Sequence, residues 1–346
     1  MSIKLQRQYE MTIYPAQYLQ TNPVVSNTAP NSAPNLNQNL VLSYIPPGSF
    51  TFSPAVGNPI VITDPFTLIM NIERKALATV NNGNFQIYNL NQATRTALYK
   101  DYTDLLCMRR ITLKAGYRST GNMSIVFDGN IKWCTSYRKQ GSNNFVTEIE
   151  AFDWAFPVVN AYTNANFSGV QPVNSVVKQC INDICAMGPS GQQVKPGYIH
   201  NFVDNNNNPL TVYNQTVSDP SWKALQQWTG GAAFIDSGQL NVLSDDDCYT
   251  GTFTEINAST GLLGSPKRSA TYVIVELMFE PSLTVGQQIH LLTNSEPQFN
   301  GPYKVFGVNH AGIISDGIGG RLQTNVTLFS FIKNAQLISL SQGGQT

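Results

Sequence analysis

Apolar and polar residues alternate along two long blocks of this chain, and this alternation constrains the fold more than any other feature. A period of two places successive side chains on opposite faces of a strand, so one face is buried and the other meets solvent. The first block, residues 61–160, is therefore expected to form half-buried antiparallel strands, with one short helix at 91–100 capped by Asn91. The alternating residues are Phe85 and Ile87; Ile111, Leu113 and Ala115; Met123, Ile125 and Phe127; and Phe145, Thr147 and Ile149.

The same period returns in the second block, residues 246–340, which predicts a second all-β domain. Gly317, Gly319 and Gly320 lie between two of its strands instead of between a strand and a helix, so they are expected to form a turn and not a nucleotide-binding loop. No repeat between the two blocks is visible in the sequence. The predicted strands span 272–279, 288–292, 303–314 and 322–331.

Residues 161–245 follow a helical period instead. A second helix is predicted from Pro220 to Gly230, with Trp222 and Leu225 buried, and a hairpin follows at 232–243. This region is therefore expected to be a small α/β domain inserted between the two β blocks. The first helix opens after Pro172, and its apolar stripe consists of Val173, Val176, Val177, Cys180, Ile181 and Ile184.

The first 60 residues differ from the rest of the chain. After a possible strand at 4–14 they are rich in Pro, Asn and Ser, a composition that cannot bury enough apolar surface to fold alone. We expect residues 1–60 to form an extended arm, laid along a neighbouring subunit. Residues 341–346 are expected to be a short C-terminal tail.

Charged residues make up only 12% of the chain, about half of the roughly 25% that is usual in soluble domains. Neutral polar side chains replace them, and these are buried across interfaces at a lower desolvation cost than charges. Lys and Arg number 21, as do Asp and Glu, which gives no argument for a nucleic-acid or membrane partner. DNA could still pass through a channel lined by the protein, because transit needs no attraction. No signal peptide or membrane span is expected.

The cysteines and histidines do not predict a catalytic centre. The five cysteines are odd in number and scattered, so free buried thiols are expected. No nucleophile signature accompanies the three histidines, which are expected to be polar strand or loop residues. These residues are Cys107, Cys134, Cys180, Cys185 and Cys248, and His200, His290 and His310.

Acidic residues give equally weak signals. Asp245, Asp246 and Asp247 could collect a hard cation, but a solvated loop between domains is the favoured interpretation. Glu148 and Glu150 lie on the outward phase of a strand, and their spatial separation decides whether a carboxylate pair could cleave sugars. No metal and no cofactor are expected.

Aromatic residues at the end of the first block are more informative. Trp133 and Tyr137 share one face of a predicted strand, and Trp154 and Phe156 follow the last strand of the block. Most of them are expected in a hydrophobic core. The alternative is an interface, where desolvated Trp and Tyr side chains commonly anchor binding.

The order of elements in the two blocks resembles that of phage baseplate hub proteins. The pattern of a strand, Asn-Leu, a helix, a strand ending in Ala-Gly-Tyr and a strand with Gly-Asn-Ile is fairly specific, and the likeness covers roughly residues 60–335. The segments that carry it are 66–74, 83–99, 111–117, 127–131, 261–266, 275–281 and 299–305.

This resemblance implies a non-enzymatic virion protein, assembled in the host cytoplasm. Hubs of this family, like the spike proteins of type VI secretion, are homotrimers in which each chain carries two tube-like antiparallel β-barrels. Six barrels can dock on a hexameric tail tube, while the other end carries the three-fold central spike. The implied partners are further copies of the chain, the tube and spike proteins, other baseplate and tape measure proteins, and DNA in transit. Two alternatives stay open: a receptor- or glycan-binding tail protein, and a tail-associated cell-wall hydrolase.

Overall fold

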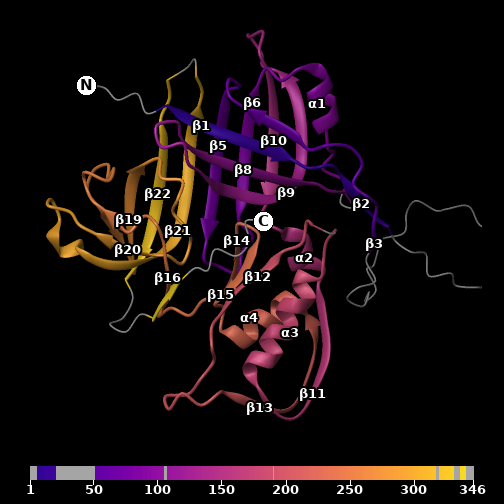
Figure 1. Cartoon of the computed structure of the whole chain (residues 1–346), viewed down its shortest axis with the longest axis vertical. Coiled ribbons are helices and arrows are strands. Elements are labelled where there is room, and N and C mark those ends of the chain that lie inside the picture. Colours follow the sequence, from indigo (N-terminus) through magenta and orange to yellow (C-terminus); the bar gives the residue numbers. More distant parts are fainter. Residues whose placement is uncertain are drawn as a thin grey trace, which may run out of the picture.

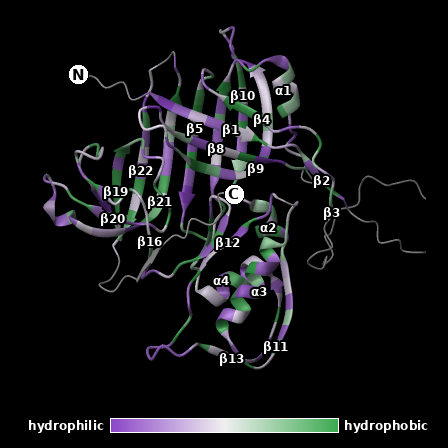
Figure 2. Cartoon of the chain, viewed as in Figure 1, coloured by the Kyte–Doolittle hydropathy of each residue, from purple (hydrophilic) through white to green (hydrophobic). Residues whose placement is uncertain are grey.

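The computed structural model describes residues 6–20, 51–104, 107–189, 191–316, 319–330 and 336–339. Strands dominate it, as the alternating sequence predicts, and helices are few. Figure 1 shows the strands gathered in a broad β layer, with α2, α3 and α4 in a lobe beneath it. Figure 2 shows hydrophobic and hydrophilic colours alternating along many of these strands.

Both β blocks lie in one sheet of 13 strands, whose main path runs β18-β19-β22-β21-β5-β6-β10-β9-β8-β1-β4. The described strands form no closed barrel, because this path has two ends. The first block supplies β4 (Ile60–Thr63), β5 (Leu68–Lys75), β6 (Asn82–Tyr88), β8 (Arg110–Tyr117), β9 (Met123–Arg138) and β10 (Phe145–Phe152). The second supplies β17 (Glu255–Ile256), β18 (Lys267–Ser269), β19 (Tyr272–Met278), β20 (Gln288–Leu291), β21 (Gly301–Ile314) and β22 (Leu322–Phe329).

The strand order of the first block repeats in the second. In the first, β5 and β6 pair, β6 pairs with β10, β10 with the long strand β9, and β9 with β8. In the second, β18 and β19 pair, β19 pairs with β22, β22 with the long strand β21, and β21 with β20. All of these pairs are antiparallel, and equivalent strands follow one another in the same chain order. The sheet therefore contains two five-strand units of matching topology, joined where β21 pairs with β5.

The core of the first unit lies between its sheet and the strands that fold over it. Strand β1 (Arg7–Ile13) pairs with β8 and β4, and its Met11 and Ile13 are fully buried. The strand expected at 4–14 is thus found at residues 7–13. It was expected within the N-terminal arm, but it belongs to this sheet because Tyr9, Met11 and Ile13 alternate with polar residues and are buried. Further along the arm, β2 (Gln17–Gln20) and β3 (Thr51–Phe52) form a small sheet with β7 (Cys107–Met108) of the first block. Residues 21–50 lie outside the described residues.

The helix predicted at 91–100 is α1 (Gln92–Leu98), and Asn91 caps it by accepting a hydrogen bond from the backbone N–H of Thr94 at 2.7 Å. The expected phase of β9 is wrong at its start. Met123 and Ile125 are exposed, whereas Val126 and Phe127 are buried. A β-bulge, where the pairing with β8 shifts between Leu113 and Lys114, rotates the strand by one residue at this point.

The lobe is built on α3 (Val173–Cys185), and the predicted apolar stripe of this helix is buried as expected. Helix α4 (Ser221–Thr229) packs against it and ends at Gly230, which adopts a left-handed conformation with φ of 63°. Leu225 is buried as predicted, but Trp222 is only half-buried. The other elements of the lobe are α2 (Ala155–Asn160), the ribbon of β11 (Tyr162–Pro172) and β13 (Thr211–Pro220), and the sheet of β12 (Lys195–Ile199), β15 (Gln239–Val242) and β14 (Ala233–Asp236).

A third core fills the second unit, between β19, β22 and β21 on one side and β20 with β17 on the other. The strands predicted here agree with β19 to β22 to within a few residues. Gly317 of the expected turn lies outside the described residues. The remaining elements are β16 (Asp247–Thr250), which pairs in parallel with β23 (Gln336–Ser339), and the short 3-10 helix η1 (Pro297–Phe299).

Candidate functional site: an aromatic ladder on the sheet

Trp133 and Tyr137 point to the same face of β9, as the sequence predicts, and each meets a carboxylate on the next strand. Glu150 of β10 lies directly opposite Trp133, and the indole N–H donates a hydrogen bond to Glu150 Oε2. Tyr137 donates its hydroxyl proton to Glu148 Oε1 at 2.8 Å. This hydrogen bond raises the pKa of the Tyr137 phenol, so the hydroxyl stays a donor at neutral pH.

Each carboxylate also receives a second donor. Lys132 Nζ lies 2.9 Å from Glu150 Oε1, and Gln86 Nε2 of β6 lies 2.8 Å from Glu148 Oε1. The two glutamates are therefore occupied by structural partners, and they hold the aromatic rings in place. We call Trp133, Tyr137, Glu148 and Glu150 the aromatic ladder.

A shallow depression of about 320 Å³ lies beside the ladder, between β5, β6, β10 and β9. Amide side chains line it next to the indole of Trp133, and both glutamates border it. The sequence placed Trp133 and Tyr137 on one face, but it could not reveal their partners, because strand register decides which side chains meet across a sheet. The polar side chains at the depression are Asn71, Asn84, Gln86, Glu148 and Glu150.

The other two aromatic candidates lie elsewhere. Trp154 is 1% exposed and belongs to the core of the lobe, so it does not lie on a surface that a partner could reach. Phe156 of α2 is half-buried and packs edge-on against Phe52, with ring centroids 5.9 Å apart. The core expected for these aromatic residues is therefore found for Trp154, while Trp133 and Tyr137 remain the interface candidates that share one face.

The three histidines occupy different environments. His310 is fully buried in β21, and its Nδ1 lies 2.9 Å from the hydroxyl of Thr324. Burial lowers its pKa well below the ordinary value, which keeps the ring neutral. His200 Nδ1 lies 2.6 Å from Asp247 Oδ2, and His290 is exposed on β20.

The expectation of a solvated loop at 245–247 is wrong for its last residue. Asp247 begins β16, is 2% exposed, and accepts hydrogen bonds from His200 and from the backbone N–H of Ser244. Among the described residues no group of three or more His, Cys, Asp or Glu side chains could hold a metal ion. All five cysteines are free; four are buried and Cys185 is half-buried.

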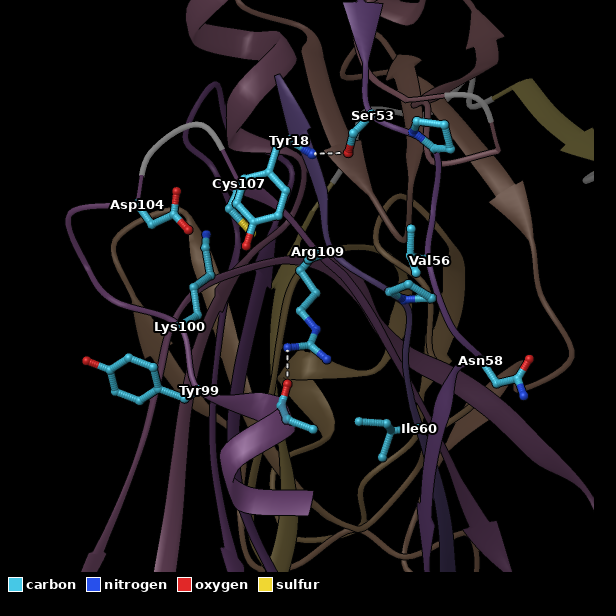
Figure 3. A pocket seen from close by; sticks show the side chains of 14 residues that line it. Tyr18, Ser53, Val56, Asn58, Ile60, Tyr99, Lys100, Asp104, Cys107 and Arg109 are labelled. Carbon is cyan, nitrogen blue, oxygen red and sulfur yellow. Dashed lines mark hydrogen bonds between the residues drawn. The ribbon is translucent and has the colours of Figure 1, made fainter. Parts of the chain in front are cut away.

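The cavity shown in Figure 3 lies between α1 and the small sheet of β2, β3 and β7, and its volume is about 550 Å³. Arg109 donates to the carbonyl of Ala97 at 2.7 Å and so satisfies the C-terminal end of α1. Lys100 donates to the carbonyl of Ile131, also at 2.7 Å. Burial raises the pKa of the Cys107 thiol, which disfavours the thiolate that a nucleophile requires. Arg109 and Lys100 thus anchor the C-terminal end of α1 and the residues that follow it.

The comparisons with known proteins agree with this geometry. The sequence profile of the Baseplate hub gp41 family matches residues 50–311, so the chain belongs to that family. It is a phage baseplate protein and thus a component of the virion tail. No curated protein sequence matches the chain. None of the helices in the described ranges combines the length and apolarity needed to span a membrane.

Several solved structures are similar to this chain at low sequence identity. The tail protein from Neisseria meningitidis MC58 is 10% identical, with 77% of this chain and 96% of that chain covered and a TM-score of 0.47. The E. coli c3393 protein, a component of the type VI secretion system, is 9% identical, with coverages of 78% and 75% and a TM-score of 0.49. A chain of the Francisella PdpA-VgrG complex is 8% identical, with coverages of 95% and 53% and a TM-score of 0.50. For the last of these chains, the likeness concerns the fold alone.

Proposed function

We propose that this chain forms a homotrimeric baseplate hub, which joins the hexameric tail tube to the three-fold central spike and encloses part of the tail channel. The observation that carries the proposal is the repeated strand order of the sheet. Each chain presents two units of the same topology, β5-β6-β10-β9-β8 and β18-β19-β22-β21-β20. Three chains in a closed ring would therefore present six similar units to a six-fold tube.

We propose that the matching units are the two tube-like domains that the family resemblance implies, at 61–160 and 246–340, with the lobe of 161–245 between them. Strand directions support this. Every neighbour along the path from β18 to β9 is antiparallel, so moving four strands along the sheet restores the same direction. The three inner strands of each unit are similar in length: β9 and β21 have 16 and 14 residues, β10 and β22 have 8 each, and β6 and β19 have 7 each. The outer strands β18 and β20 are shorter than their equivalents β5 and β8.

The outward face of the sheet fits a channel through which DNA passes without being held. A row of amide side chains crosses the junction of the two units: Asn84, Asn71, Asn309 and Asn325. Asn309 donates to Asn71 Oδ1 at 2.9 Å. Tight DNA binding depends on Lys and Arg contacts to phosphates, and this row offers none. We propose that this face borders the channel.

The N-terminal segment is the part of the chain that we propose contacts its neighbours. The arm leaves the small sheet at Gln20 and returns at Thr51, and these two residues lie opposite each other in β2 and β3. Limited proteolysis tests the contact: the segment between them should be protected in the assembled particle and cleaved in the isolated chain. Equal cleavage in both states would contradict an intersubunit role for the arm.

Native mass spectrometry of the full chain tests the proposed assembly, with a mass of three 38.0 kDa chains expected. Co-purification with the tube and spike proteins is the second expected result, and other baseplate and tape measure proteins are further candidate partners. A stable monomer that binds neither the tube nor the spike protein would contradict the proposal.

The depression beside the aromatic ladder favours one other function, glycan binding. A half-buried aromatic ring next to amide and carboxylate groups suits a sugar ring with its hydroxyls, and Trp133, Asn84 and Glu150 provide these groups. A glycan array with the full chain tests this alternative. Binding that Trp133→Ala abolishes would support it.

A further inference from the structure

The repeat within the sheet also indicates where one copy of the chain would meet the next. We infer that the open end of β9 in one copy pairs with the free edge of β18 in a second copy, and that this contact reproduces the internal junction of β21 with β5. The inference rests on the proposed trimer and names the surface that would close its ring.

The internal junction supplies the template. Residues Gly307–Ile314 of β21 pair antiparallel with Leu68–Lys75 of β5, and the central pairs join Ala311 to Asn71 and His310 to Ile72. Only the second part of β21 makes this contact, because its first part pairs with β20. A single long strand thus pairs first with a strand of its own unit and then with a strand of the neighbouring unit.

The long strand of the other unit, β9, has the same arrangement with one contact missing. Its first part pairs with β8, up to Asn130. Residues 135–138 have β10 on one side, but no strand among the described residues pairs with them on the other. Within the part of the chain that the structure describes, strand β18 is likewise paired only with β19, which leaves its second edge open there. These are the positions that β21 and β5 fill at the internal junction.

The paired strands fix the register of the new contact. Arg138 lies opposite the first residue of β10 and Gly312 opposite the first residue of β22, so Tyr137 corresponds to Ala311. The pairing of β6 with β10 and of β19 with β22 aligns Asn84 with Ile274 in the same way. Asn71 of β5 lies opposite Asn84 and Lys267 of β18 lies opposite Ile274, so Lys267 corresponds to Asn71. Lys267 of the second copy should therefore lie opposite Tyr137, and Arg268 of the second copy opposite Ser136.

The length of the open edge matches the length of β18. Just before the open residues, Cys134 exchanges two backbone hydrogen bonds of 3.0 Å with Lys100. Strand β18 ends at Ser269, and Ala270 then turns the chain with φ of 52°. A second copy would therefore fill the edge up to the point where Lys100 closes it.

The side chains at the contact are accessible and compatible. Tyr137 is 43% exposed, and all three residues of β18 are exposed. The aliphatic part of Lys267 can pack over the phenol ring, with its ammonium held by the face of the ring. Arg138, the residue after Tyr137 on β9, also carries a positive charge, but its guanidinium donates a hydrogen bond to Asn143 of the same hairpin.

A disulfide between the two strands tests the inference. The backbone N–H and C=O of Cys134 point to the open edge, where they bond to Lys100, and this direction alternates from residue to residue along a strand. The N–H and C=O of Tyr137, three residues later, therefore point to β10, and Tyr137 would form a non-hydrogen-bonded pair with Lys267 of the second copy. The Cα atoms of such a pair are about 4.5 Å apart, within disulfide range. We expect the full chain carrying Y137C and K267C, oxidised mildly in assembled particles, to migrate as a covalent trimer on a denaturing gel.

The matched control combines K267C with T135C, which shifts the register by two residues and places the Cα atoms about 7–8 Å apart, too far for a bridge. The parent chain, with its five native cysteines, should also remain uncrosslinked. A second pair, S136C with R268C, covers the case in which the first variant does not assemble. Three copies per particle without a covalent product from either pair would overturn the proposed contact and leave the trimer intact. A particle without three copies would overturn the proposed function itself.

Discussion

At the residue scale, buried polar side chains fasten the parts of the molecule together. Arg74 of β5 donates to the carbonyl of Leu283 at 2.6 Å and to the hydroxyl of Ser237, and it lies 3.5 Å from Asp236 of the lobe. One guanidinium thus links the first unit, the lobe and the second unit. Burial raises the pKa of Asp236 even though Arg74 opposes that effect.

We expect Arg74→Met to lower the free energy of unfolding by about 3–5 kcal/mol, because it leaves the buried Asp236 without its partner. Combining it with Asp236→Leu should restore part of the loss, since no buried charge then remains. Lys75→Met is the control, because its ion pair with Glu73 is exposed and should contribute less than about 1 kcal/mol. Urea unfolding measures all three; equal losses in the single and double variants would refute this role of Arg74.

His310 makes stability depend on pH. The folded protein keeps the ring neutral, since its pKa lies well below the ordinary value, whereas the unfolded chain binds a proton below pH ~6.5. Stability is therefore lost as pH falls below that value, by about 1.4 kcal/mol per pH unit. His310→Gln should flatten this dependence in urea unfolding at pH 7 and pH 5. The exposed His290→Gln should leave the slope unchanged, and an unchanged slope in His310→Gln would contradict the assignment.

At the element scale, the sequence predicts elements whose own pattern is strong. The stripe of α3, the cap of α1 at Asn91 and the alternation of β10 and β22 each appear as predicted. It fails where pairing with another strand decides the outcome. The bulge in β9 reverses the faces of Met123 and Ile125, and β11 was missed although Thr163, Ala165 and Phe167 alternate with polar residues.

The apolar stripe of α3 gives a direct test at this scale. Ile181 is 1% exposed in the core of the lobe, so Ile181→Ala should lower the free energy of unfolding by about 2–5 kcal/mol through lost burial and a cavity. Lys178 lies on the exposed side of the same helix, and Lys178→Ala should change it by less than about 0.5 kcal/mol. Thermal or urea unfolding followed by circular dichroism distinguishes them. A similar small effect in both would mean that the lobe has no packed core at this position.

At the scale of the whole molecule, the repeat is a property of strand pairing and not of sequence. Equivalent positions such as Tyr137 and Ala311, or Lys267 and Asn71, hold side chains of different size and chemistry, because one of each pair lies at an internal junction and the other at an open edge. No comparison of the two blocks as sequences could therefore find it. For the same reason the sequence predicted Trp133 and Tyr137 as neighbours but could not predict their glutamate partners.

Electron cryomicroscopy of the tail end of purified particles tests the central claim most directly. We expect a closed ring of three copies at the junction of tube and spike, in which six five-strand units face the tube at regular angles. A single copy, six copies, or three copies that place only one of the two units against the tube would contradict it.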